Sequence, residues 1–281
     1  MNILSLQSHV AYGHVGNSAA VFALQRLGVE VWPVHTVQLS NHTAHETARG
    51  RAFEAAHIRE VVQGLGERGA LARCDAVLSG YIGSVEIGGA ILDAVKETKR
   101  ANSNAVYCCD PVIGDVGRGA FVSPEVTAFM RERAVPAADM VTPNHFELEQ
   151  ITDRKITSLA GACDAVGALQ KVGPRVVLVT SLLTGETPVD SIDLIACDAS
   201  SRCRLRTPKL AVAAHGAGDL IAALFLAHYL RTRSVAEALS NAAASVFGVL
   251  KRAGTDPKEM ALIEGQDELV NPTERFRTEP L

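Results

Sequence analysis

The sequence predicts an α/β protein: a three-layer α/β/α sandwich around a central, mostly parallel, twisted sheet. Short apolar, β-branched runs alternate with longer segments of helical periodicity along most of the chain, which is typical of a parallel sheet covered on both faces. A chain of 281 residues with 47% hydrophobic residues can bury a full core. Because no repeat, low-complexity stretch or linker divides it, we expect a single domain over residues 1–281.

The amino-acid composition argues against nucleic acids and membranes as partners. The formal net charge of -4 and the absence of long Lys/Arg blocks argue against a nucleic-acid surface. The six cysteines show no CxxC spacing, so we expect reduced thiols. No charged leader with a cleavage site and no apolar run of about 18 residues is present. We therefore expect a cytoplasmic protein with no membrane contact.

The first half of the chain alternates strands and helices. A helix capped near Gly16 has apolar residues at helical spacing until Gly28. Residues 7–17 before it are too polar for a core and follow a strand's carboxyl end, where open α/β sheets bind ligands. The other elements expected here are strands at 3–6, 29–39, 75–79 and 105–109 and helices at 53–71 and 87–100.

The second half continues the pattern. Pro143 ends a short strand at 139–141, and a further strand covers 175–179. Residues 192–197 and 202–206 have the pattern of a hairpin. An Ala/Leu-rich helix follows Asp219, another covers 235–252, and residues 271–281 look like a tail.

The stretch Ala213-Ala214-His215-Gly216-Ala217-Gly218-Asp219 is the strongest candidate for chemistry. Its glycines allow a close backbone approach, and the amides at the start of the next helix can hold a phosphate. A carboxylate there, Asp219, can accept the proton of an attacking hydroxyl. The alternative is that Asp219 only stabilises the helix N-terminus.

Polar groups at other strand ends suit a nucleotide bound with magnesium. Asp110 ends a strand and Asp115 follows in a Gly-rich loop, although an Asp-Pro turn and a solvated aspartate would explain both. Asn144 and Glu147 have the spacing of a helix capping box, and also that of groups that order water around Mg²⁺. Thr180 and Ser181 place two hydroxyls at a further strand exit, and the loop containing Arg118 can close over a nucleotide.

The histidine-rich segment 40–46 has two explanations. His42 and His45 could be metal ligands, but no carboxylate or thiol lies near them at a convincing spacing, so we favour a loop that faces the substrate. Tyr81, beside a glycine at another strand exit, can stack on a planar ring or simply pack.

Taken together and in order, these motifs resemble the pyridoxal kinases of the ribokinase-like superfamily over essentially the whole chain. Gly-x-Gly-Asp and Asn-x-x-Glu mark the superfamily broadly, whereas the first two motifs of the series point to the pyridoxal branch. The series is Ser-His-x-x-x-Gly-x-x-Gly-Asn at 8–17, Ser-Asn-His-Thr at 40–43, Ser-Gly-Tyr at 79–81, Cys-Asp-Pro-Val-x-Gly-Asp at 109–115, Thr-Pro-Asn-x-Phe-Glu at 142–147, Thr-Ser at 180–181 and Gly-Ala-Gly-Asp at 216–219.

The resemblance implies transfer of the ATP γ-phosphate to the 5′-hydroxymethyl group of pyridoxal, pyridoxine or pyridoxamine in vitamin B6 salvage. It implies Asp219 as the catalytic base, with Gly216, Ala217 and Gly218 as its anion hole, which also contacts ATP. Ser8 and Thr43 would contact the polar edge of the pyridine ring and Tyr81 its face. The implied Mg-ATP residues are Asp110, Asp115, Asn144 and Glu147, with hydroxyls of Thr142, Thr180 and Ser181 toward the phosphates and Thr142 also beside the metal.

Two departures from the family pattern bear on these expectations. Ala217 stands where the family usually has Thr or Val, which removes a hydroxyl but keeps the backbone amides. Ala44-His45-Glu46 follows Thr43 where the family tends to carry an aromatic residue, so vitamer preference stays open. The resemblance also implies a homodimer and a monovalent cation such as K⁺. The alternatives are a hydroxymethylpyrimidine kinase or another ribokinase-like small-alcohol kinase, and a non-catalytic vitamer-binding protein on the same fold.

Overall fold

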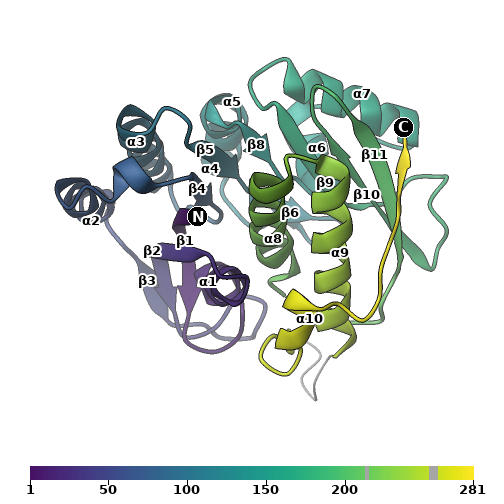
Figure 1. Cartoon of the computed structure of the whole chain (residues 1–281), viewed down its shortest axis with the longest axis horizontal. Coiled ribbons are helices and arrows are strands. Elements are labelled where there is room, and N and C mark those ends of the chain that lie inside the picture. The colour runs from purple at the N-terminus through teal and green to yellow at the C-terminus, as the bar shows by residue number, and fades with distance from the viewer. Residues whose placement is uncertain (213–214, 253–258) are drawn as a thin grey trace.

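A computed structural model describes residues 1–212, 215–252 and 259–281, so Ala213 and Ala214 of the expected phosphate-binding stretch lie outside the described residues. Within these residues one sheet has the strand order β12-β11-β10-β9-β8-β5-β4-β1-β2-β3 (Figure 1). Its strands are β1 (Asn2–Val10), β2 (Glu30–Leu39), β3 (Gly50–Ala52), β4 (Ala76–Ser79), β5 (Val106–Cys109), β8 (Met140–Val141), β9 (Val176–Leu182), β10 (Ser191–Cys197), β11 (Arg202–Pro208) and β12 (Thr278–Pro280).

The centre of the sheet is parallel and its edges are antiparallel. Strands β2, β1, β4, β5, β8 and β9 pair in parallel, whereas β3 and the series β10, β11 and β12 pair antiparallel. The chain passes from β1 to β2 on one side and returns to β4 on the other. The carboxyl ends of β1 and β4 therefore flank the point where the winding direction reverses, which is where such sheets form a ligand crevice.

Helices cover both faces, so the predicted three-layer α/β/α sandwich is confirmed. Each face has its own apolar core, one under each helical layer. One layer contains α1 (Asn17–Arg26), α8 (Ala217–Thr232), α9 (Val235–Lys251) and α10 (Gln266–Val270), and Figure 1 shows α8 and α9 in front of the sheet. The other contains α2 (Ala55–Glu67), α3 (Val85–Ala101), α4 (Pro124–Phe129), the π-helical turn η2 (Met130–Ala134), α5 (Val135–Ala137), α6 (His145–Thr152) and α7 (Leu159–Gln170).

The first strand is longer than the sequence predicts. The polar residues after Leu6 were expected outside the core, but β1 runs to Val10 and buries Gln7 and Ser8. A buried amide explains this, because the Asn17 side chain accepts a hydrogen bond from Ser5 Oγ (2.7 Å), and Gln7 Nε2 also donates to Ser5 Oγ (3.0 Å). Paired polar groups can be buried at little cost, so apolar periodicity alone underestimates the strand.

Other boundaries also differ. The tail contains β12, which pairs with β11, and β9 continues through Thr180 and Ser181 instead of ending before them. Helix α2 ends at Glu67 and is followed by the short 3₁₀ turn η1 (Leu71–Arg73). The helices at Pro124–Phe129 and Leu159–Gln170, which the sequence did not predict, begin at the side-chain caps Ser123 and Ser158.

Across the described residues all six cysteines are free thiols. In the same part of the chain, no helix combines the length and apolar character needed to cross a bilayer.

Candidate active site

A cavity of about 640 Å³ opens where the carboxyl ends of the parallel strands meet the N-terminus of α8. The strand register explains the convergence, because Ser79, Cys109 and Val141 are successive partners across β4, β5 and β8. The next residues of these strands therefore point into one crevice. The predicted residues that line it are Asp110, Asp115, Thr142, Asn144, Glu147, Thr180, Ser181, Gly216, Ala217, Gly218 and Asp219.

The turn at the start of α8 needs a glycine at position 216. Gly216 is the N-cap, with a φ of 90° that favours glycine, and a Cβ there would lie 1.8 Å from the carbonyl oxygen of His14. Gly218 differs, because a Cβ built there would meet nothing within 4 Å. The backbone thus leaves open space beside the first turn of a 16-residue helix, where amides and the helix dipole favour an anion.

Asp219 lies in this first turn and faces the cavity. Burial raises its pKa to about 6, while hydrogen bonds from the backbone amides of Gly16 and of Asp219 itself act in the opposite direction. A carboxyl group with this pKa is mostly ionised at neutral pH and can still take up a proton.

Asp110 and Glu147 form a buried pair of acids, each 5% exposed. Burial and repulsion by Glu147 and Asp219 raise the pKa of Asp110 well above its usual range, although Thr142 Oγ1 donates a hydrogen bond to it (2.7 Å). Burial likewise raises the pKa of Glu147 to about 8, against hydrogen bonds from backbone amides. Two carboxyl groups that are shielded from water and repel each other, with a hydroxyl beside them, suit a hard cation such as Mg²⁺.

Asn144 and Glu147 also form the capping box that their spacing predicts. The Asn144 side chain accepts from the amide of Glu147 (2.9 Å), and the Glu147 carboxylate accepts from the amide of Asn144 (2.9 Å). Glu147 additionally accepts from the amide of Ile113 (2.9 Å), and Asn144 Nδ2 donates to the carbonyl of Gly114 (2.8 Å). The cap therefore ties the start of α6 to the loop that carries Asp115.

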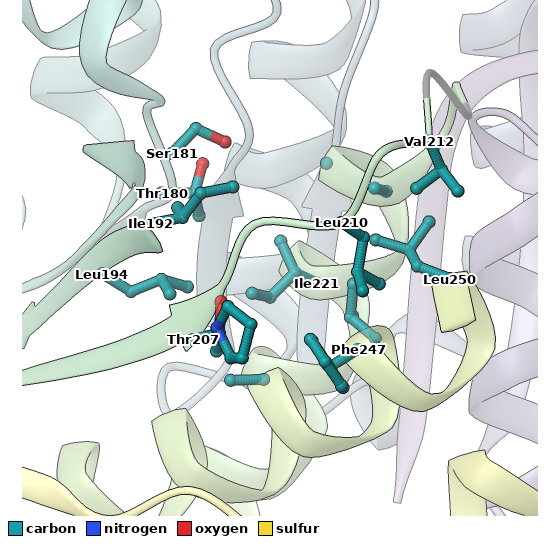
Figure 2. A pocket seen from close by; sticks show the side chains of 15 residues that line it. Thr180, Ser181, Ile192, Leu194, Thr207, Leu210, Val212, Ile221, Phe247 and Leu250 are labelled. Atoms are coloured by element: carbon teal, nitrogen blue, oxygen red, sulfur yellow. The ribbon is translucent and has the colours of Figure 1, made fainter. Parts of the chain in front are cut away.

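A second, largely apolar cavity of about 170 Å³ adjoins the first (Figure 2). In Figure 2 Thr180 and Ser181 lie on one side, and Leu250 and Val212 on the other. Both cavities share Thr180, Ser181, Val212, Ala217, Gly218 and Leu250. The apolar walls from α8, α9 and residues 210–212 were not predicted as site residues, since single apolar side chains carry no functional signal in a sequence.

The three residues expected to contact a pyridine ring do not line the large cavity. Ser8 is close to it through Gly16, where a Cβ would lie 2.5 Å from Ser8 Oγ and whose amide donates to Asp219. Thr43 is exposed in the turn after β2, next to Ala44, which does line the cavity. Tyr81 is half-buried at the exit of β4, where its carbonyl accepts a hydrogen bond from Thr36 Oγ1 (2.8 Å).

Arg118, whose loop the sequence analysis expected to close over a nucleotide, lines this cavity and places a cation there. It lies in the turn between β6 (Gly114–Asp115) and β7 (Gly119–Ala120), and its Nη1 is 3.1 Å from His215 Nδ1. Its guanidinium also lies 4.9 Å from the centroid of the Phe121 ring.

The expectation that no carboxylate accompanies His42 and His45 is wrong. Glu259, distant in sequence, lies with both histidines, and their ligand atoms are all within 4.8 Å of one another. Sequence spacing could not reveal this cluster because β2 and the segment after residue 258 meet only in the folded protein.

Comparison with known proteins places these features in a family. The family model described as phosphomethylpyrimidine kinase matches residues 23–261. The chain is 47% identical to pyridoxal kinase PdxY of Corynebacterium diphtheriae over 100% of both proteins. It is 51% identical to pyridoxal kinase PdxY of Granulibacter bethesdensis over 98% of both.

Solved structures agree with these matches. Pyridoxal kinase from Leishmania donovani in complex with ADP and pyridoxamine superposes with a TM-score of 0.90 at 28% identity, covering 100% of this chain and 99% of that one. For pyridoxal kinase from Entamoeba histolytica the TM-score is 0.92 at 24% identity, which is a likeness of fold. The motif-based resemblance is thereby confirmed, and the chain belongs to the pyridoxal kinase family.

Proposed function

We propose that this protein is an ATP-dependent pyridoxal kinase, which transfers the γ-phosphoryl group of ATP to the 5′-hydroxymethyl group of pyridoxal, pyridoxine or pyridoxamine in vitamin B6 salvage. The observation that carries the proposal is the position of Asp219, in the first turn of α8 and in the same cavity as Asp110 and Glu147. Related kinases bind the matching ligands, since the Leishmania donovani enzyme is in complex with ADP and pyridoxamine or pyridoxine.

Asp219 is the base in this proposal. With a pKa of about 6, its carboxylate takes the proton as the substrate hydroxyl attacks the γ-phosphorus. The hydrogen bond from the Gly16 amide fixes the carboxylate beside Ser8 and orients it toward the hydroxyl. The phosphoryl group moves to the alcohol oxygen, ADP leaves, and the proton remains on Asp219 until product release.

The groups proposed to contact the transferring phosphoryl group are hydrogen-bond donors and positive charges held in place by the fold. Open space beside Gly218 and the positive end of α8 accommodate the transferring group, whose charge increases on its equatorial oxygens. The hydroxyls of Thr180 and Ser181 lie at the boundary between the two cavities and contact phosphate oxygens. Arg118 adds a positive charge at the same cavity.

Magnesium fits the remaining groups. When bound, Mg²⁺ neutralises phosphate charge and aligns the β- and γ-phosphates. Asp110, Asp115, Thr142 and Glu147 would hold it, directly or through water, because their oxygen atoms are the ligand type that this cation prefers.

The rest of each substrate occupies the neighbouring surfaces. The apolar cavity lined by Ile221, Phe247 and Leu250 takes the adenine ring of ATP, since such a pocket buries a flat base with few polar contacts. Ser8 and Thr43 contact the polar edge of the pyridine ring and Tyr81 its face.

Replacing the base tests the assignment. In Asp219→Asn, kcat should fall by about 10²–10⁴-fold, because the amide cannot accept the proton, while pyridoxal and ATP still bind. The assay follows the absorbance of the phosphorylated product with ATP and Mg²⁺, and calorimetry measures binding. Asp164→Asn, on the exposed face of α7, is the matched control and should keep the wild-type rate. An unchanged kcat in Asp219→Asn would refute the role of this residue.

The matching family model favours one alternative substrate, a hydroxymethylpyrimidine. Both reactions phosphorylate a hydroxymethyl group on a nitrogen heterocycle, so the phosphate apparatus does not distinguish them. Comparing kcat/KM for pyridoxal and for hydroxymethylpyrimidine under the same conditions decides between them, and we expect pyridoxal to be preferred.

We extend the proposal to the protein's organisation. It works as one domain over residues 1–281, as a homodimer in the cytoplasm, with K⁺ as a possible monovalent activator. Free thiols at all six cysteines favour a reducing compartment. Light scattering of the purified protein measures the dimer, and rates in K⁺ and in tetramethylammonium buffers measure the cation effect.

A further inference from the structure

Two segments meet at the edge of the cavity and bring two imidazoles and a carboxylate together. His42 and His45 come from the loop after β2, and Glu259 begins the described segment that leads to α10. We propose that these three side chains bind Zn²⁺ at a site separate from the Mg²⁺ carboxylates.

The geometry is already close to that of a coordination sphere. Glu259 Oε1 lies 2.8 Å from His42 Nε2 and 2.8 Å from His45 Nε2, so one carboxylate oxygen faces both rings. A tetrahedral ion with bonds of about 2.0–2.1 Å needs ligand atoms about 3.3 Å apart. The two 2.8 Å pairs would therefore open by roughly half an ångström, and side-chain rotation would bring the ligand atoms of the two imidazoles, which lie within 4.8 Å of each other, to the same spacing.

The polar contacts of His42 and Glu259 are incomplete. The His42 side chain is 7% exposed, its Nε2 lies 2.8 Å from Glu259 Oε1, and its Nδ1 is buried without a hydrogen-bond partner among the described residues. Glu259 Oε2 is likewise buried without a described hydrogen-bond partner. Buried polar atoms are nearly always paired, and a metal ion would satisfy His42 and Glu259 at once.

The backbone around Glu259 is shaped for this contact. Gly13 has a φ of 90°, and a Cβ there would lie 2.2 Å from Glu259 Oε2. The loop after β1 therefore passes close to the carboxylate only because residue 13 is glycine. Next to it, the carbonyl of His14 packs on Gly216, so the cluster borders the turn that holds Asp219.

The donor set selects the metal. Two imidazole nitrogens and one carboxylate oxygen are typical of Zn²⁺ sites with an open fourth position, and Mg²⁺ disfavours imidazole. Thr43 and Ala44 lie between the two histidines, so Zn²⁺ would fix the loop that carries Thr43 against the segment after residue 258. The site thus controls the position of a proposed substrate contact.

Zinc titration of the full-length protein, without ATP or pyridoxal, tests the proposal independently of kinase activity. Excess Mg²⁺ in the buffer occupies the carboxylates of the phosphate site. We expect one Zn²⁺ per chain by calorimetry, with affinity reduced by roughly 100-fold or more in His45→Ala and in Glu259→Gln. Both side chains are partly exposed, so these variants should fold.

His57→Ala is the matched control, because His57 is an exposed histidine on α2 outside the cluster. It should bind Zn²⁺ like the wild type. Thermal unfolding gives a second measurement, in which Zn²⁺ should raise the Tm of the wild type and of His57→Ala but not of His45→Ala. Equal Zn²⁺ affinity in the wild type and in both cluster variants would overturn the proposal and leave the cluster as a hydrogen-bonded contact between loops.

Discussion

Asp219 combines two properties that a proton acceptor needs. It lies out of bulk water, which raises its pKa, and two backbone amides hold its carboxylate and limit that rise. The resulting value of about 6 is close to the pH at which the proposed reaction runs.

The pH dependence of turnover should follow Asp219. Its protonated form cannot accept a proton, so kcat/KM should fall about tenfold per pH unit below about pH 6 and reach a plateau above it. Initial rates at saturating Mg-ATP between about pH 5 and 8 give the profile. Repeating it with pyridoxine in place of pyridoxal separates ionisation of the substrate from that of the enzyme. A profile that stays flat through pH 6 for both substrates would contradict the role of Asp219.

Glu147 should couple Mg²⁺ binding to proton release. Its pKa rises from 4.5 to about 8 in the fold, so at neutral pH it holds a proton that the cation must displace. The apparent Mg²⁺ affinity should therefore increase by up to about tenfold per pH unit between pH 6 and 8 for each proton released. Calorimetry in two buffers of different ionisation enthalpy counts the protons.

Glu147→Gln is the control for this prediction, and it should bind Mg²⁺ more weakly with fewer protons released.

The raised pKa of Glu147 also affects the stability of the fold when no cation is bound. A carboxyl group whose folded pKa is raised stabilises the fold in its protonated form, and this contribution is lost as pH rises from about 4.5 toward 8. Mg²⁺ should therefore raise Tm more at pH 8 than at pH 6.

At the scale of elements, the first turn of α6 has two roles, helix capping and lining the cavity. The capping box formed by Asn144 and Glu147 satisfies backbone amides, and the same side chains face the cavity. The two explanations that the sequence left open are compatible, because the Glu147 carboxylate that caps the helix N-terminus also lines the cavity, where its oxygen atoms can serve a cation.

Comparing N-cap variants of α6 and α7 separates the capping role from the role in the cavity. Asn144→Ala and Ser158→Ala each remove an N-cap side chain, from α6 and α7, and each should lower the free energy of unfolding by about 1 kcal/mol. Only Asn144→Ala also breaks the hydrogen bond to Gly114 beside Asp115, so only this variant should raise KM for Mg-ATP. Urea unfolding and steady-state kinetics measure the two effects. Unchanged KM in Asn144→Ala would reduce its role to capping.

At the scale of the whole molecule, β12 lies outside the site. The large cavity gathers the carboxyl ends of β5, β8 and β9, residues 278–281 line neither cavity, and β12 covers the edge of β11 through three paired residues. An uncovered strand edge exposes unpaired amides and carbonyls and invites association.

Removing residues 278–281 tests whether activity is independent of β12. The shortened chain loses the pairing of β12 with β11 and the ion pair between Arg204 and Glu279, and should lose roughly 1–2 kcal/mol of stability. Its kcat and KM should match the full chain, and light scattering should show increased self-association. A large loss of kcat with intact folding would show that this edge reaches the site.

Most of the fold and most of the residues that line the large cavity were predictable because both depend on local patterns. Asp110 and Thr142 directly follow two parallel strands, and a parallel sheet brings such ends to one edge whatever its exact length. Prediction failed where burial depends on pairing, as for Gln7 in the extended β1, which stays buried within a hydrogen-bond network that includes Ser5 and Asn17. It also missed β12, whose three residues have no periodicity of their own.

The amino-acid sequence alone determined the alternation of strands and helices, the glycine turn before α8 and the kinase family, since these depend on neighbours along the chain. Only the tertiary structure decided how distant groups act on one another. It set the raised pKa of Asp110, which results from burial and from repulsion by Glu147 and Asp219, and the raised pKa of Glu147, which results mainly from burial. It also placed Glu259 against His45 across 214 residues, because a contact of that separation is made by packing and leaves no trace in local spacing.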